Sequence, residues 1–332
     1  MSVLVLGGAG YIGSHTVYEL IDKGEDVAIV DNLETGHIEA VHPKARFYQG
    51  DIRDRAFVDS VFEKEPVDAV IHFAANSLVG ESMSNPLKYY DNNVCGTKVL
   101  LESMIAHDVK KIVFSSTAAT YGEPENIPIL EQDRTCPTNT YGETKLAMEK
   151  MMKWTDMAHG LKYVALRYFN ACGAHERGCI GEAHSPETHL IPLILQVPLG
   201  QREYISIFGD DYDTKDGTCI RDYIHVTDLA QAHILAVDYL MKGGQSNTFN
   251  LGNGVGFTVR EVIEAAQEAT GLAIAAKTAQ RRAGDPARLI ASSDKARSVL
   301  GWNPQHADLK EIISSAWKWH SGHPHGFESQ EV

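Results

Sequence analysis

Short apolar runs alternate with longer amphipathic segments through the first half of the chain. The runs contain no regular alternation with polar residues, which is typical of strands buried on both faces of a parallel sheet. Strands are expected at Val3–Leu6, Val27–Val30, Val67–Phe73, Lys110–Phe114 and Tyr163–Leu166. Helical periodicity falls between them, at Tyr11–Lys23, Arg55–Glu63, Pro86–His107 and Gly142–His159. This order predicts an α/β protein with a doubly wound parallel sheet.

The pattern changes after Phe169, where Gly, Pro, His and Asp become frequent over residues 171–224. A helix is expected near Leu190–Leu199 and a further sheet strand at Thr248–Leu251. The remaining expected helices are Val226–Lys242, Val259–Thr270, Asp294–Leu300 and Leu309–His320. We therefore expect two units. One comprises residues 1–170 and 224–250, and the other is a smaller, discontinuous α+β unit of residues 171–223 and 251–332.

The composition argues against nucleic acids and membranes as partners. The 332 residues include 30 Lys and Arg against 44 Asp and Glu, a formal net charge of −14. No basic stripe suggests a nucleic-acid partner, and no apolar run approaches the roughly 18 residues that a membrane-spanning helix needs. The first residues lack the basic segment of a signal peptide. The five cysteines have no CxxC spacing, so we expect reduced thiols and a cytoplasmic location.

Three glycines, Gly7, Gly10 and Gly13, follow the first expected strand and open the first helix. A pyrophosphate needs close approach of the backbone at the positive end of a helix, so side chains must be absent there. Asp31-Asn32 end the second strand, where a carboxylate can bind ribose hydroxyls and disfavours a 2′-phosphate. The alternative is an ordinary Gly-rich turn. The whole unit predicts a Rossmann-type domain that binds NAD rather than NADP.

Tyr141 and Lys145 form a YxxxK motif at the head of an expected helix. The i, i+4 spacing places both side chains on one helical face. A free tyrosine has a pKa of about 10, and a neighbouring ammonium together with a positive nicotinamide ring favours the phenolate. Thr117 follows the fifth strand and can share the substrate proton with Tyr141. These three residues are the expected catalytic group. The alternative is an exposed tyrosine with a solvated lysine, and a polar strand end that forms a turn.

The GxxGxxG spacing resembles the extended short-chain dehydrogenase/reductase superfamily, and essentially the whole chain resembles its UDP-glucose 4-epimerases. The matching segments are GGAGYIGSHT, VGES, PLKYYDNNVCGT, KKIVFSST, YGETK, LRYFN, IFGDDY, DGTCIRDYIHV, NLGNG and RRAGD. RYFN and RDYIHV, together with the glycine loop, are specific to this branch of sugar-nucleotide enzymes.

The resemblance implies reversible 4-epimerisation of UDP-glucose and UDP-galactose, by transient oxidation at C4′ with a retained NAD. Tyr141 would remove the 4′-hydroxyl proton, Thr117 would relay it, and Lys145 would bind the nicotinamide ribose. The first unit would be the NAD-binding domain and the smaller unit the UDP-sugar-binding domain. A homodimer is also implied, through the helix near Pro86–His107 and the helix after Tyr141.

The same resemblance implies a set of ligand contacts, in which Arg221 and Arg282 match phosphate geometry bidentately and give an acidic protein local cations. The implied cofactor contacts are Gly7, Gly10, Tyr11, Ile12, Gly13, Asp31, Asn32, Asp51, Ile52, Phe73, Ala74, Asn92, Ser115, Tyr141, Lys145 and Phe169. The implied substrate contacts are Thr117, Tyr141, Asn170, His189, Leu190, Phe208, Arg221, Arg282, Asp285 and Leu289.

Four positions depart from the family pattern. Asn76-Ser77 stands where many epimerases have a lysine that helps to bind the cofactor, which predicts slightly weaker retention of NAD. His189 stands where many have asparagine, and Thr140 replaces a proline. Leu289 occupies a position where many narrow-specificity members carry tyrosine. The smaller side chain predicts relaxed specificity that extends to UDP-GlcNAc and UDP-GalNAc.

Three other functions are consistent with parts of the sequence. A sugar-nucleotide 4,6-dehydratase needs an Asp-Glu pair after the catalytic threonine, where this chain has Ala118-Ala119. A 4-epimerase of a UDP-pentose and, less favoured, a non-catalytic NAD-sensing protein stay open. No metal site is expected, because His175 with Cys172 and Cys179 fits no zinc spacing and the histidines near the C-terminus resemble a solvated tail.

Overall fold

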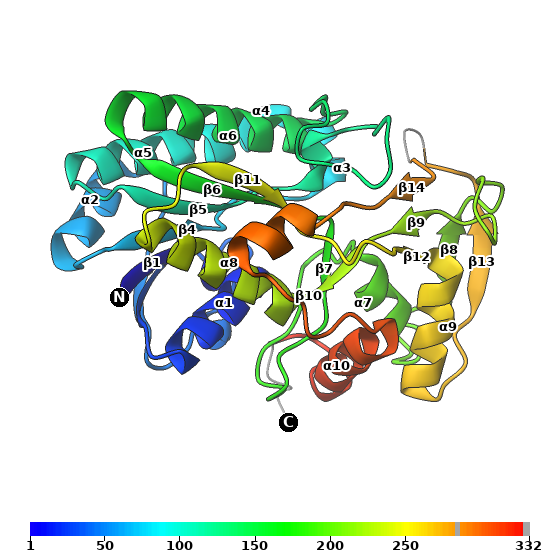
Figure 1. Ribbon diagram of the computed structural model, residues 1–332. Coiled ribbons are helices and arrows are strands. Elements are labelled where there is room, and N and C mark those ends of the chain that lie inside the picture. The colour runs from blue at the N-terminus through cyan, green and yellow to red at the C-terminus, as the bar shows by residue number, and fades with distance from the viewer. Residues whose placement is uncertain (283–285, 328–332) are drawn as a thin grey trace.

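The larger part of the molecule is built on a seven-stranded parallel sheet (Figure 1). The computed structural model describes residues 1–282 and 286–327. The strands lie in the order β11-β6-β5-β4-β1-β2-β3, which confirms the doubly wound arrangement. Their bounds are β1 Ser2–Leu6, β2 Asp26–Asp31, β3 Arg46–Gln49, β4 Ala69–His72, β5 Lys111–Ser115, β6 Lys162–Arg167 and β11 Asn247–Asn250. Six of these agree with the predicted apolar runs. The edge strand β3 has no such run, because its residues are only partly buried.

Helices cover both faces of this sheet (Figure 1). One face carries α1 Tyr11–Asp22 and α8 Val226–Met241, and the other carries α2 Arg55–Lys64, α5 Gly96–Ala106 and α6 Thr140–His159. Alternate residues of a strand point to opposite faces. Val3 and Val5 therefore pack into the core with α1 and α8, while Leu4 and Leu6 pack into the core with α2, α5 and α6. Burial on both faces explains why β1 is apolar throughout.

The helix expected at Pro86–His107 is interrupted. It consists of α4 Pro86–Tyr89, a π-helical segment Tyr90–Cys95, and α5. The π-helical segment buries Asn93, whose side-chain amide exchanges two hydrogen bonds with the backbone of Asn76, at 2.8 and 3.0 Å. The wider π-helical segment thus holds a polar side chain inside the layer of helices. The hydrophobic periodicity of the sequence does not predict this change of helix type. The preceding short helix, α3 Val79–Ser84, was not expected either.

The smaller part of the molecule has its own core, formed by α7 Leu190–Leu195, α9 Val259–Thr270 and α10 Leu309–Gly322 against short strands. The strands form three small sheets: β7 Asn170–Cys172 with β10 Tyr223–His225, β8 Ile205–Phe208 with β13 Ala276–Ala279, and β12 Phe257–Thr258 with β9 Ile220–Arg221 and β14 Arg288–Leu289. These strands have two to four residues, too few for a periodic signal. Helix α7 ends four residues before the expected Leu199, because Pro198 disfavours helical backbone in the residue before it.

Residues 294–302 do not pack with the unit to which the sequence assigned them. The expected helix Asp294–Leu300 is largely a π-helical turn, Ala296–Leu300. Ala296, Leu300 and Trp302 lie in the core beneath α8, although the sequence grouped them with the smaller unit. The Trp302 indole donates a hydrogen bond of 2.9 Å to the backbone oxygen of Asp228, at the start of α8. Within residues 1–282 and 286–327, no helix is long and apolar enough to cross a membrane.

Candidate active site

The glycine turn between β1 and α1 uses its three glycines for two different purposes. A Cβ on Gly13 would lie 2.0 Å from the carbonyl oxygen of Gly7, and one on Gly7 would lie 2.6 Å from the backbone nitrogen of Ala74. These two glycines allow α1, the end of β1 and the segment after β4 to pack closely against one another. A Cβ on Gly10 would meet only the Gly7 oxygen, at 3.4 Å, so the packing of the chain itself does not require glycine there. Space at Gly10, beside the uncapped N-terminus of α1, fits a bound pyrophosphate.

Asp31 connects this turn to the end of β2. Its carboxylate accepts hydrogen bonds from the backbone nitrogens of Ala9 (3.0 Å) and Leu33 (2.9 Å). Burial raises the pKa of Asp31, and these two backbone donors oppose that shift. A carboxylate oxygen has two lone pairs. The oxygens of Asp31 therefore keep acceptor capacity for the ribose hydroxyls of a dinucleotide.

The other predicted cofactor residues surround the same edge of the sheet. Phe73 and Ala74, after β4, both donate backbone hydrogen bonds to the Leu6 oxygen. Asp51 is paired with Arg53 at 2.6 Å, and the neighbouring Ile52 is buried. The remaining members are Asn32 after β2, Tyr11 and Ile12 on α1, Asn92 in the π-helical segment, Ser115 at the end of β5, and Phe169 just before β7. The carboxyl ends of parallel strands are where such folds bind their ligands.

The start of α6 packs against the turn that follows β5, and this contact brings the predicted catalytic residues together. Thr117 follows β5 and caps the 3₁₀ turn Ala118–Thr120. A Cβ on Gly142 would lie 2.6 Å from the carbonyl oxygen of Ala119, so a glycine is needed where α6 meets this turn. Tyr141 and Lys145 then lie on α6 with the Lys145 ammonium 5.9 Å from the centre of the Tyr141 ring. The same ammonium donates a hydrogen bond of 2.9 Å to the Ser115 carbonyl oxygen.

Burial shifts the pKa values of Tyr141 and Lys145. It raises the pKa of Tyr141 to about 12, against a hydrogen bond from Thr117 that lowers it. Burial also lowers the pKa of Lys145 to about 7, with the Glu149 carboxylate opposing. In the chain without cofactor, desolvation of the phenolate therefore dominates the pKa of Tyr141. That Lys145 and a bound nicotinamide ring together favour the phenolate stays a prediction.

A buried ion pair beneath the catalytic group was not anticipated. Glu149, one turn after Lys145 on α6, accepts two hydrogen bonds from Arg167 of β6, at 2.5 and 2.9 Å. It also accepts one of 2.5 Å from the Ser116 hydroxyl. Both charged side chains are 7% exposed. The only signal in the sequence was a glutamate on the same helical face as the catalytic pair.

The predicted substrate residues come from seven separate segments of the chain. Asn170 of β7 donates a hydrogen bond of 3.0 Å to the Asp222 backbone oxygen. The Arg282 guanidinium stacks on the Phe208 ring, 4.0 Å from its centre. Asp285, also predicted here, lies outside the described residues.

Arg221 and Leu289 are direct neighbours in the pairing of β9 with β14. Leu289 packs against a small cluster formed by Ala118, Tyr121 and Ile129. Ala118 is the residue after Thr117, so the predicted specificity position lies beside the catalytic turn. Tyr121 and Ile129 also line a neighbouring hollow of about 350 Å³.

His189 precedes α7, which Leu190 begins. Its Nδ1 lies 2.9 Å from Glu187 and 3.0 Å from Glu182. Burial alone would lower the pKa of His189, but the two carboxylates raise it to about 10. His184 makes similar contacts with both glutamates. The sequence analysis named only His189 of these four residues, because their spacing matches no familiar motif.

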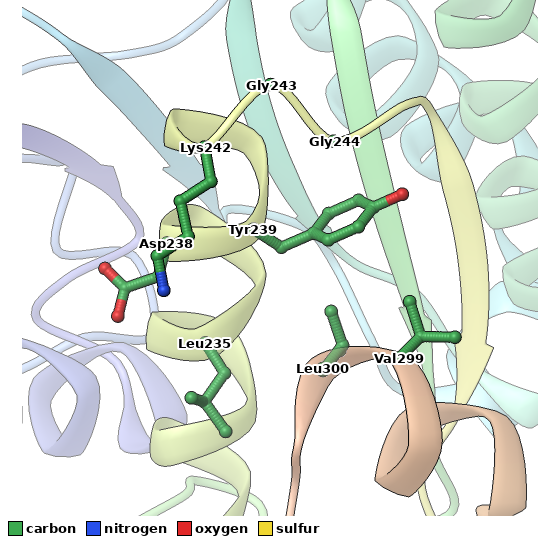
Figure 2. A pocket seen from close by; sticks show the side chains of 8 residues that line it. All are labelled: Leu235, Asp238, Tyr239, Lys242, Gly243, Gly244, Val299 and Leu300. Atoms are coloured by element: carbon green, nitrogen blue, oxygen red, sulfur yellow. The ribbon is translucent and has the colours of Figure 1, made fainter.

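A separate pocket of about 290 Å³ lies between α8 and the π-helical turn Ala296–Leu300 (Figure 2). Figure 2 shows Tyr239, Leu235 and Leu300 around it, with Asp238 and Lys242 on the helix beside them. Asp238 is paired with Lys23 at 2.7 Å. No predicted site residue lines this pocket, so it is not part of the candidate site.

The fold and the glycine turn define a dinucleotide-dependent enzyme, in which Thr117, Tyr141 and Lys145 are the predicted catalytic group. Residues 3–252 match the family described as "NAD dependent epimerase/dehydratase family". A UDP-glucose 4-epimerase of Halalkalibacterium halodurans is 61% identical over 330 residues, covering 99% of this chain and 98% of that protein. The chain belongs to the UDP-glucose 4-epimerases of this family, and NAD is its cofactor.

Solved structures agree with this assignment. A crystal structure of a UDP-glucose 4-epimerase has a TM-score of 0.98 at 58% identity, covering 99% of this chain and 100% of the other. The UDP-glucose 4-epimerase from Bifidobacterium longum, solved in complex with NAD+ and UDP, has a TM-score of 0.93 at 41% identity, covering 98% and 100%.

The two roles of the glycines can be separated by substitution. We expect Gly10→Ala to fold normally but to lose affinity for NAD by about tenfold or more, since the added methyl group occupies ligand space, and tenfold is ~1.4 kcal/mol. NAD released on denaturing the purified protein, and a direct titration with NAD, measure the effect. Gly13→Ala should instead lower thermal stability without any ligand, and Gly322→Ala, with open space around it, should change neither. Unchanged NAD affinity in Gly10→Ala would contradict the assignment.

Proposed function

We propose that this chain interconverts UDP-glucose and UDP-galactose by transient oxidation of the sugar at C4′, with the residue roles given below. The observation that carries the proposal is the convergence of Thr117, Tyr141 and Lys145 at the ligand edge of the sheet, beside the glycine turn. The Bifidobacterium longum relative was solved with NAD+ and UDP, which supports a nucleotide diphosphate as the second ligand.

Tyr141 is the proposed base for the 4′-hydroxyl proton, and Thr117 relays that proton through the hydrogen bond between the two side chains. Lys145 lies one helical turn away and binds the ribose next to the reacting ring. Bound NAD supplies the site with a hydride acceptor and donor and with a positive charge that favours the phenolate. Because Tyr141 is buried and its pKa is raised, proton removal depends on that added charge.

The uridine diphosphate is held by the smaller part of the molecule. We assign the diphosphate to Arg221 and Arg282, since guanidinium groups bind phosphate bidentately. Asp285 is proposed as a further contact of the UDP from the sequence alone. The Arg282 guanidinium lies over one face of the Phe208 ring, and the ring offers an aromatic surface for the uracil. The further proposed contacts of the nucleotide sugar are Asn170, His189 and Leu190. A firmly held nucleotide lets the oxidised hexose turn over and accept the hydride on its other face.

Two further parts of the proposal concern organisation. We assign NAD binding to residues 1–170 and 224–250 and sugar-nucleotide binding to residues 171–223 and 251–332, with Ala296, Leu300 and Trp302 packed on the first unit. We also place the protein in the cytoplasm, which is supported by five cysteines that are all free thiols.

Rival functions differ at identifiable residues. Ala118-Ala119 cannot transfer protons, which argues against a 4,6-dehydratase. A UDP-pentose substrate is compatible with the same catalytic group and is decided by assay. A non-catalytic NAD-binding protein has no need for Thr117, Tyr141 and Lys145 in one place.

Tyr141→Phe tests the proposed base. We expect the conversion of UDP-galactose to UDP-glucose to fall at least about a hundredfold, the scale of a general base, while NAD and UDP still bind. Products are separated by chromatography from assays without and with added NAD, because Asn76-Ser77 lacks the family's lysine. Tyr204→Phe, on a tyrosine outside the site, serves as the matched control. Equal rates in Tyr141→Phe and wild type would exclude the mechanism.

Relaxed specificity is proposed from Leu289, which lies between Ala118 and Arg221. A leucine there leaves room that a tyrosine ring would fill. We expect Leu289→Tyr to reduce turnover of UDP-GalNAc by roughly 10–200-fold, the usual range for steric discrimination, and to leave UDP-galactose turnover nearly unchanged. Leu289→Met, which conserves volume, is the control. The hypothesis is rejected if neither the parent nor the variant acts on UDP-GalNAc.

A homodimer is proposed from exposed apolar side chains on two neighbouring helical segments. Met83 and Leu87, on α3 and α4, are 60% and 77% exposed, and Trp154 and Met157 of α6 are 63% and 69% exposed. These helices pack against one another, and exposed apolar residues on neighbouring helices are typical of protein–protein interfaces.

Charge introduced at these exposed residues should prevent dimerisation. We expect the Trp154→Glu/Met157→Glu variant to sediment as a monomer, because dimer formation would bury two unpaired carboxylates per chain. Leu272→Glu, which changes an exposed apolar residue outside this group, should sediment like wild type. Wild type that sediments as a monomer at all concentrations would refute the dimer.

A further inference from the structure

Four ligand-type side chains converge in the loop that leads from β7 to α7. Glu182, His184, Glu187 and His189, hereafter the Glu-His cluster, each offer one nitrogen or oxygen atom within 4.8 Å of all the others. The two glutamate side chains are nearly buried, at 4% and 8% exposure. Carboxylates in such surroundings require positive partners. The four residues occupy eight consecutive positions with the spacing Glu-x-His-x-x-Glu-x-His.

The Glu-His cluster contains four short contacts between ring nitrogens and carboxylate oxygens. His184 Nδ1 lies 3.3 Å from Glu182 Oε1 and 3.4 Å from Glu187 Oε2, and His189 Nδ1 lies 3.0 Å from Glu182 Oε1 and 2.9 Å from Glu187 Oε1. One ring nitrogen carries a single proton or a single lone pair, so neither Nδ1 atom can fully satisfy two carboxylates.

These separations resemble the edges of a coordination tetrahedron. A tetrahedral ion with ligand bonds of about 2.0–2.1 Å has edges of about 3.3 Å. The four nitrogen–oxygen distances, 2.9 to 3.4 Å, lie near that value, although the two histidines contact different oxygens of Glu187. With one ligand atom from each residue, the four atoms lie within 4.8 Å of one another, so a bound ion would draw them closer together.

We propose that the Glu-His cluster binds one Zn²⁺ ion through two imidazole nitrogens and two carboxylate oxygens. Mixed nitrogen and oxygen ligands in a tetrahedral set suit zinc, whereas calcium and magnesium prefer oxygen ligands alone. Four protein ligands close the coordination sphere, so the ion has a structural role and activates no water. The sequence analysis expected no metal, because it considered only cysteine-containing spacings and the C-terminal histidines.

The proposed ion would fasten the loop where the two parts of the molecule meet. The His37 ring makes a hydrogen bond of 3.0 Å to the Ala183 oxygen, and the Trp319 indole donates one of 3.2 Å to the Glu182 oxygen. The loop therefore contacts both the β2–β3 connection and α10. His189 is the residue before α7, so coordination also fixes the position at which that helix begins. Tyr11 of α1 lies edge-on to the His184 ring at 6.1 Å.

Metal binding to the full-length protein, without an affinity tag and after removal of metals with a chelator, tests this proposal. Titration with Zn²⁺ should show one tight site per chain, and Co²⁺ should give the intense visible bands of a tetrahedral complex. His184→Gln and Glu187→Gln should each weaken Zn²⁺ binding at least ~100-fold, since even second-shell changes cost 10–100-fold. Zn²⁺ should raise the thermal unfolding temperature of wild type but not of these variants.

Two controls separate this site from other histidines. His306 contacts one carboxylate, Glu311, at 2.5 Å, so His306→Gln removes a similar pair outside the Glu-His cluster and should keep the site. The variant His323→Gln/His325→Gln should also keep it. If wild type binds no Zn²⁺ more tightly than His184→Gln does, the four residues form only a hydrogen-bonded ion-pair group and the proposal is wrong. Should a variant fail to fold by circular dichroism, the Co²⁺ spectrum of wild type decides.

Discussion

The buried ion pair of Glu149 and Arg167 connects the parts of the fold that must stay in register for chemistry. Glu149 belongs to α6, Arg167 to β6, and their hydroxyl partner Ser116 to the segment after β5. Of the residues proposed to react, Thr117 directly follows Ser116, while Lys145 and Tyr141 lie about one and two helical turns before Glu149 on α6. Removing one partner of a buried pair usually costs about 3–5 kcal/mol, because it leaves a charge without compensation. The geometry of the site is therefore tied to the stability of the core beneath it.

Burial of this kind has a cost for the catalytic group itself. It favours a neutral Tyr141 and a partly neutral Lys145, so the chain alone is poorly prepared for proton removal. In the proposed mechanism, the positive charge of bound NAD shifts that balance toward the phenolate. A base that is active only with its cofactor would avoid unproductive chemistry.

The sheet and its covering helices could be predicted because their signal is local and repeated. Continuous apolar runs mark β1, β2, β4, β5 and β6, and the glycine turn marks the ligand edge. The interruption of the helix at Tyr90–Cys95 could not be predicted, since it depends on a hydrogen bond between Asn93 and a backbone distant in sequence. The strands of residues 170–223 were missed because strands of two to four residues carry too little periodicity and owe their conformation to partners far along the chain.

Site residues that belong to a sequence motif could be predicted. Residues whose role depends on tertiary contacts could not. Tyr141, Lys145 and Thr117 were recognised by spacing and order. Arg167 looked like an ordinary charged residue at a strand end, and only folding brings it to Glu149. The Glu-His cluster was overlooked for a different reason, as its members are close in sequence but become a converging set only when the loop bends back on itself.

The parallel register of β9 and β14 places Arg221 and Leu289 side by side, held by backbone hydrogen bonds that do not depend on either side chain. One position is assigned to the invariant part of the substrate and the other to its variable part. Substrate range can therefore diverge in evolution by replacing a single side chain, while the anchor for the shared nucleotide is inherited unchanged. The same separation makes this strand pair a suitable starting point for altering sugar preference by design.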